Sequence, residues 1–77
     1  MRINMKKHIM RQLNSRGDEK IAEWTLENEV EVQRALDEFV YHTKRGSVAF
    51  NGTTSEQLET FDPQIEETII VPQIAGG

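Results

Sequence analysis

Apolar side chains recur with a helical period in one stretch of the chain, from Asn28 to Arg45. They fall at i, i+3, i+4, i+7, i+8 and i+11, which places six residues on one helical face: Val32, Ala35, Leu36, Phe39, Val40 and Thr43. Asn28, followed three residues later by Glu31, forms a capping-box pattern at the start. Gly46 stands where a helix commonly ends in a left-handed glycine. We therefore predict a helix over residues 28–45.

Alternating apolar and polar positions before this helix predict a β-hairpin. Residues 2–10 alternate in part, which indicates a half-buried strand. Residues 14–19 are a dense turn cluster that contains Gly17. Residues 20–26 alternate again, so Ile21 and Glu23 share one face and three apolar side chains share the other: Ala22, Trp24 and Leu26.

The chain after the helix predicts shorter elements and one buried strand. Ser47–Phe50 is a short β-run, and Asn51-Gly52 is a strong turn signal. A polar loop with Leu58 and Phe61 as apolar anchors follows, with a short strand over 58–61 and one helical turn over 62–67 capped by Asp62. Thr68–Val71 is apolar at consecutive positions, which predicts a final strand over 67–71 that is buried on both faces.

These elements predict an α+β fold in which one helix packs on a mixed sheet, with the first and last strands at its centre. The length of 77 residues suits one domain, which we assign to residues 1–72, followed by a tail over residues 73–77 that ends on Gly76-Gly77.

Composition narrows the function classes. The absence of cysteine excludes a disulfide framework, a thiolate metal site and a cysteine nucleophile. No apolar stretch approaches the ~20 residues that a membrane span needs, and the N-terminal residues lack the pattern of a signal peptide, so we expect a cytoplasmic protein without membrane association. The first twenty residues carry a net charge of +4 and the remainder −8. An acidic body disfavours binding to nucleic acid.

No set of side chains predicts catalysis. The two histidines, His8 and His42, lie far apart in the sequence, and the latter suits the C-terminal end of a helix dipole. There is no phosphate-binding loop, no Ser-His-Asp set and no metal-ligand spacing. Trp24 is expected in the core. We therefore expect no enzyme, no cofactor and no metal.

The order hairpin, helix, strand, short strand, strand resembles the β-grasp fold of ubiquitin and its relatives. Residues 66–77, Glu-Glu-Thr-Ile-Ile-Val-Pro-Gln-Ile-Ala-Gly-Gly, resemble the ending of the small sulfur-carrier proteins of molybdopterin and thiamine synthesis. Residues 47–52 resemble their middle strand with its Asn-Gly turn. Carriers commonly have two prolines before the tail, whereas Gln73 follows Pro72 here, and the turn over residues 11–19 is longer than the tight ubiquitin-type turn.

The resemblance implies that the reacting group is the carboxylate of Gly77, next to Gly76. An E1-like enzyme would adenylate it with ATP, and sulfur or an amine would displace AMP. Two residues without Cβ atoms would let the tail enter a narrow adenylation site. The expected docking surface is the exposed sheet face near three residues: Pro72, Ile74 and Ala75. A second hypothesis is a small binding or adaptor module, of phage origin, without tail chemistry; a third is a frayed end without function.

Overall fold

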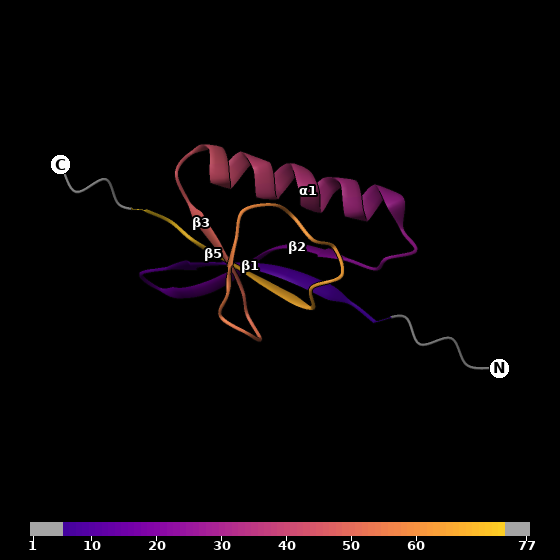
Figure 1. Cartoon of the computed structure of the whole chain (residues 1–77), viewed down its shortest axis with the longest axis horizontal. Helices are drawn as coiled ribbons and strands as arrows, with labels where there is room; N and C mark the ends of the chain where they lie inside the picture. The colour runs from indigo at the N-terminus through magenta and orange to yellow at the C-terminus, as the bar shows by residue number, and fades with distance from the viewer. Residues whose placement is uncertain (1–5, 74–77) are drawn as a thin grey trace.

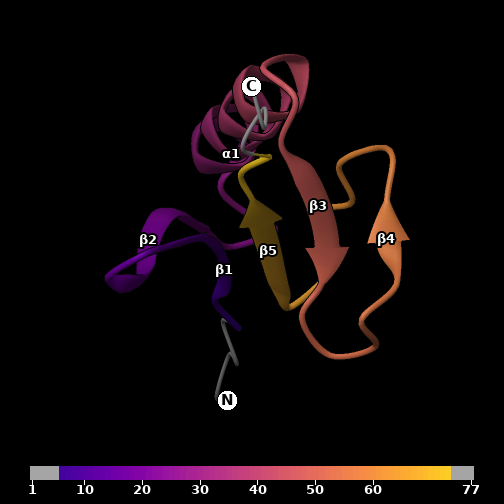
Figure 2. The same ribbon diagram turned by 90° about the vertical axis from the view of Figure 1, so that its left-hand side faces the viewer.

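The chain folds as an α+β domain, seen in a computed structural model that describes residues 6–73 (Figure 1). Its elements are β1 His8–Asn14, β2 Gly17–Trp24, α1 Glu29–Lys44, β3 Val48–Asn51, β4 Gln57–Leu58 and β5 Glu67–Val71. The five strands form one sheet in the order β2-β1-β5-β3-β4. β1 and β5 are parallel and the other neighbours are antiparallel. This is the predicted ubiquitin-like, β-grasp topology, with the last strand at the centre (Figure 2).

The hairpin turn is tighter than the sequence pattern predicted. β1 begins at His8 and continues to Asn14, and a two-residue turn leads directly into β2. The Asn14 side-chain oxygen accepts a hydrogen bond from the backbone N–H of Arg16 at 2.8 Å. Gly17 has φ of +119°, a conformation that side chains disfavour. The predicted long turn was wrong because strand pairing uses backbone groups, so the polar residues before the turn pair as well as apolar ones do.

A β-bulge in β2 changes which side chains face the helix. Arg11 pairs with Lys20 and Met10 with Ala22, so Ile21 has no partner across the ladder. The extra residue lets both Ile21 and Ala22 pack against the core. It also brings Lys20 and Glu23 to the same face, where their side chains form an ion pair at 2.9 Å. The predicted sharing of one face by Ile21 and Glu23 was therefore wrong.

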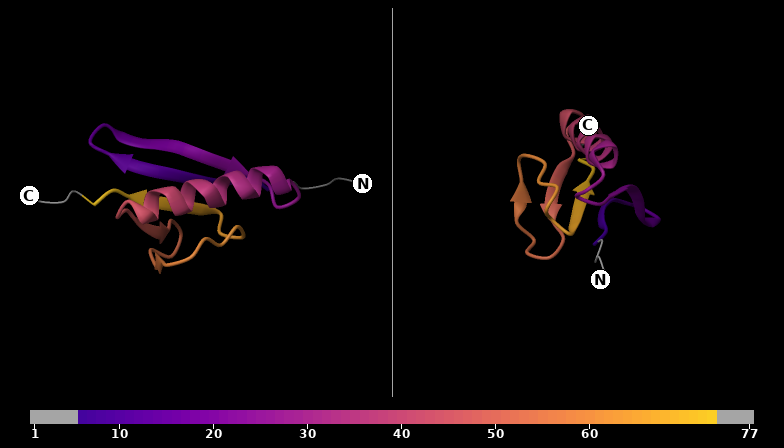
Figure 3. Two further views of the ribbon diagram at one scale, coloured as in Figure 1. Left: turned by 90° about the horizontal axis from the view of Figure 1, so that it is seen from above. Right: turned by 90° about the vertical axis from the view of Figure 1, so that its right-hand side faces the viewer.

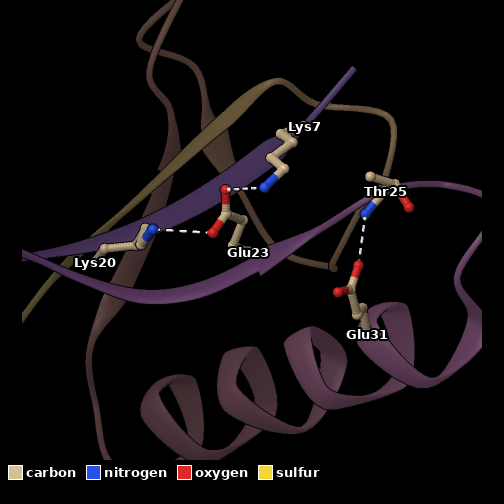
Figure 4. A network of polar contacts seen from close by, with 5 residues as sticks. All are labelled: Lys7, Lys20, Glu23, Thr25 and Glu31. Atoms are coloured by element: carbon tan, nitrogen blue, oxygen red, sulfur yellow. Dashed lines mark hydrogen bonds and ion pairs between the residues drawn. The ribbon is translucent and has the colours of Figure 1, made fainter. Parts of the chain in front are cut away.

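The helix begins and ends as predicted, within one residue. The Asn28 side chain accepts a hydrogen bond from the backbone N–H of Glu31 at 3.1 Å, and Gly46 has φ of +100°. The Glu31 carboxylate accepts from the backbone N–H of Thr25 at 3.1 Å, so it ties the helix to the end of β2 (Figure 4). The inward face is rotated from the predicted one: Val40 is 38% exposed, whereas the His42 side chain is only 15% exposed.

The core lies between α1 and the sheet, and it contains a cluster of three aromatic rings, Trp24, Phe39 and Phe61. Trp24 is fully buried, as expected, and its indole N–H donates to the backbone oxygen of Pro63 at 2.9 Å. The Phe61 ring lies 5.3 Å from that of Trp24 and 5.7 Å from that of Phe39, measured between centroids. Phe61 thus anchors the loop between β4 and β5, as predicted.

Three local predictions in this part of the chain need correction. Leu26 follows β2 and is 44% exposed, because the strand ends at Trp24. β4 is only two residues long and starts one residue before the predicted strand. Residues 62–65 form a hydrogen-bonded turn and not a helical turn: Ile65 N–H donates to the Asp62 backbone oxygen at 3.2 Å. The Asp62 carboxylate accepts from Gln64 N–H at 2.9 Å, so it closes this turn and does not cap a helix.

Candidate functional site

The candidate site lies at the end of the central strand. β5 alternates along its length, with Thr68 and Ile70 buried and Ile69 and Val71 half-buried. Pro72 follows directly and is half-buried, and Gln73 is exposed. Of the predicted site residues, only Pro72 is among residues 6–73; the remaining four lie outside the described residues: Ile74, Ala75, Gly76 and Gly77. The geometry that can be examined is therefore the surface from which this segment departs.

That surface includes the outer face of the sheet, which is the face turned away from α1. Paired residues share a face, and the pairs Phe50 with Ile69 and Val48 with Val71 alternate with the buried pair Ala49 and Ile70. Ile9 joins this face from β1. All five outer side chains are half-buried, because α1 covers the opposite face only (Figure 3). The prediction that the last strand is buried on both faces was therefore wrong: no second layer lies over Ile69 and Val71 within residues 6–73.

A strip of charged side chains borders the apolar part of the outer face. Arg11 on β1 lies between two carboxylates, with Nε 2.9 Å from Glu67 and Nη1 donating to Asp18 at 3.1 Å. Glu23 lies between Lys20 at 2.9 Å and Lys7 at 3.5 Å (Figure 4). The hydrogen bond from Lys20 is the main cause that lowers the pKa of Glu23, and together with the charges of both lysines it outweighs the opposing effect of desolvation. The outer face is thus apolar over β3, the end of β5 and Ile9, and ionic over β2, Arg11 of β1 and Glu67 at the start of β5.

The glycine of the Asn51-Gly52 turn supports this ionic strip. Gly52 N–H donates to the backbone oxygen of Glu67 at 2.8 Å. A Cβ atom on Gly52 would lie 2.6 Å from the Glu67 carboxylate oxygen and 2.9 Å from its Cγ. Glu67 can therefore turn toward Arg11 only because position 52 has no side chain. The sequence predicted a turn here, but it contains no signal for this contact, which joins residues fifteen positions apart.

The two histidines have structural roles. His8 is 4% exposed, and its ring stacks on Trp24 at a centroid distance of 5.8 Å. Its Nδ1 lies 2.9 Å from the backbone oxygen of Ile65; since a carbonyl only accepts, Nδ1 carries the proton. His42 lies 3.4 Å from Glu38, one helical turn earlier. The alternation over residues 2–10 predicted that His8 lies on the polar side of the strand, opposite Ile9, and this was wrong: His8 is buried, whereas Ile9 is half-buried on the outer face.

Within residues 6–73 no three His, Cys, Asp or Glu side chains lie together as metal ligands would. The one helix of this part of the chain is too short and too polar to cross a membrane. Comparison with protein-family models, with curated proteins and with solved structures finds no match to this chain. The fold and the surface around the end of β5 are therefore the features that bear on function.

Proposed function

We propose that the protein is a ubiquitin-like carrier or modifier that acts through the carboxylate of Gly77. A partner of the E1 type supplies the catalysis, and this chain supplies the carboxylate and the surface that the partner recognises. The observation that carries the proposal is the position of β5. It is the central strand of a β-grasp sheet, and the chain continues from its end through Pro72 toward Gly76-Gly77.

The order of elements supports the proposal because a central strand holds the start of the tail firmly. β5 pairs on one side with β1 and on the other with β3 up to Val71. Pro72 has no backbone N–H, so it cannot extend this pairing as a donor. Residues beyond it would be presented at a fixed point on the domain, next to the outer face.

The outer face supports the proposal because its apolar side chains have no partner within residues 6–73. Val48 and Val71 form a cross-strand pair at the end of the sheet from which Pro72 departs. A partner that binds this pair and Phe50 would hold the tail against its own active site. Ile74 and Ala75, which follow Gln73 in the sequence, are the further apolar residues that we propose the partner binds.

The proposed reaction has two steps with defined leaving groups. A carboxylate oxygen of Gly77 attacks the α-phosphorus of ATP, and pyrophosphate leaves to give an acyl-adenylate. A hydrosulfide ion or an amine then attacks the acyl carbon, AMP leaves, and the attacking atom loses its proton. The product is a thiocarboxylate in sulfur transfer or an amide in conjugation.

Intact-mass spectrometry after incubation with ATP and a bacterial E1-like adenylating enzyme tests this proposal. We expect an adenylate or a thiocarboxylate on the protein, and none on a Gly77→Ala variant whose thermal melting is unchanged. Val48→Ala should slow the modification, which should still occur on Gly77. An unmodified mass with a panel of such enzymes would contradict the proposal.

The outer face favours a second candidate, a binding or adaptor module without tail chemistry. The apolar pairs of β3 and β5 lie within the folded sheet and do not need Gly76-Gly77 to bind a partner. Binding that is unchanged by deletion of Gly76-Gly77, together with an unmodified mass, would favour this candidate. Binding that requires the two glycines would exclude it.

A further inference from the structure

A groove on the helix side of the molecule is lined by residues other than those of the outer face and Pro72. It has a volume of about 420 Å³ and lies between α1 and the loop that leads to β5. Its walls are mainly apolar: Leu26, Val32, Leu36, Phe61 and Pro63. Leu26 is 44% exposed, and the two helix residues are only half-buried. The loop runs beneath the N-terminal part of α1 in Figure 1, which explains how these two elements enclose a groove.

Carboxylates dominate the rim of this groove. Glu29 is the one charged residue that lines it directly, and the exposed Asp62 stands in the sequence between two of its lining residues, Phe61 and Pro63. Glu27 shares an adjoining hollow with Leu26, and Asp37 accepts a hydrogen bond from Gln33 on the rim at 3.0 Å. Two basic side chains are near: Arg34, and Lys6, which is paired with Glu66 at 2.9 Å. The rim therefore has a net negative charge around an apolar floor.

We infer that this groove binds a segment of another protein that carries one bulky apolar side chain with lysine or arginine on both sides. The apolar side chain enters between Leu36 and Phe61, where it removes apolar surface from water. The flanking cations lie opposite Glu29 and Asp62, and this charge complementarity selects against acidic segments. The assignment is independent of the proposed function, because it involves neither the outer face nor Gly77.

Trp24 is a built-in reporter for this groove, because it is the only tryptophan of the chain. Its indole N–H donates to Pro63, and its ring contacts Phe61, and both of those residues line the groove. A side chain that enters the groove alters these contacts, so tryptophan emission reports binding. Trp24 also lines a second hollow, beside Lys7 and Asn28, so the amide shifts are needed to show that binding is in the groove.

The test is a titration of the whole chain with an acetylated and amidated pentapeptide, Lys-Lys-Leu-Lys-Lys, followed by Trp24 emission and by backbone amide shifts. We expect saturable binding that maps to α1 and residues 61–63. It should be lost when the central Leu becomes Ala, or when the four Lys become Glu. Raising the salt concentration should weaken it, since exposed charges are screened beyond about 10 Å at 0.1 M.

Protein variants separate this site from general attraction to an acidic protein. Glu29→Gln should weaken binding about two- to five-fold, the effect of one exposed charge pair, and Leu26→Ala at least about five-fold. Glu19→Gln is the matched control, because it removes an exposed carboxylate from the distant hairpin. Thermal melting of each variant verifies that the fold is retained.

The inference is overturned by any of four results: no saturable change at millimolar peptide, an equal loss with Glu19→Gln, equal binding of the acidic peptide, or shifts that map to the outer face. It is also overturned by one result with the double variant Ile3→Ala and Met5→Ala. That result is a change in Trp24 emission in the absence of peptide together with loss of the competition between the start of the chain and the peptide for the groove. In that case the occupant is the start of this chain and not a partner.

Discussion

Replacing Thr68 by valine should stabilise the protein, although Thr68 is one of the most buried residues of the central strand. Its side chain is 1% exposed, and its hydroxyl oxygen has no hydrogen-bond partner among residues 6–73. A buried hydroxyl without a partner costs about 1–3 kcal/mol in proteins. Valine has nearly the same shape, keeps the β-branch that suits a strand, and removes this cost.

The expected gain in the free energy of unfolding is about 1–2 kcal/mol. In a domain of this size, each 1 kcal/mol moves the melting temperature by about 4–8 °C. Thermal denaturation followed by circular dichroism, supported by urea titration, would measure both quantities. The m-value should not change, since the substitution leaves the buried area of the fold nearly the same.

Two further variants make the result interpretable. Thr68→Ser keeps the unpaired hydroxyl and loses a buried methyl group, so it should destabilise by about 1 kcal/mol or more. Thr43→Val removes a hydroxyl that does have a partner, the backbone oxygen of Phe39 at 2.9 Å, and should give no gain. If Thr68→Val melts at or below the temperature of the parent protein, the hydroxyl has a partner in solution and the reasoning is refuted.

Other substitutions test the core, the turn and the charged strip. Phe39→Ala should cost about 3–5 kcal/mol by cavity formation, enough to unfold so small a domain; a nearly unchanged melting temperature would mean that the helix face is wrongly assigned. Gly52→Ala should displace the Glu67 side chain and lower the melting temperature, and an unchanged melting temperature would mean that Glu67 turns aside without cost. The pKa of Glu23 is lowered in the folded state, so the ionised side chain contributes to stability above the unfolded pKa of 4.5, and this contribution is lost as the pH falls through the lower folded pKa. Carboxyl titration by NMR should show that the lowering of this pKa disappears in Lys20→Ala.

The parts of the fold that were predicted correctly depend on local signals. The helix has an apolar period, a side-chain cap at Asn28 and a glycine at its end, and these features together define its limits within one residue. The central position of β5 was also predicted correctly, because a single helix can cover only one sheet. Phe61 was also predicted correctly as an apolar anchor of the polar loop before β5.

The incorrect predictions concern how strands pair, which depends on residues far apart in the chain. The bulge at Ile21 places the residues before it on the opposite faces of the sheet from those that simple alternation predicts. Nothing in the sequence around Ile21 indicates an extra residue. The contact between Gly52 and Glu67 arises from the packing of a turn on the start of β5. The groove between α1 and residues 61–63 likewise depends on where the loop crosses the helix.

The correction to β5 bears most directly on function. The consecutive apolar residues of β5 predicted that both of its faces are covered, but in this sheet only Thr68 and Ile70 are buried. Ile69 and Val71 keep their apolar character on a half-exposed face, next to the point where Pro72 ends the pairing. An isolated apolar side chain on a surface needs no explanation, but these five lie on neighbouring strands, which is why we propose the outer face as the surface that a partner binds. The outer face can be substituted without disturbing the core between α1 and the sheet, so variants such as Val48→Ala can separate binding from stability.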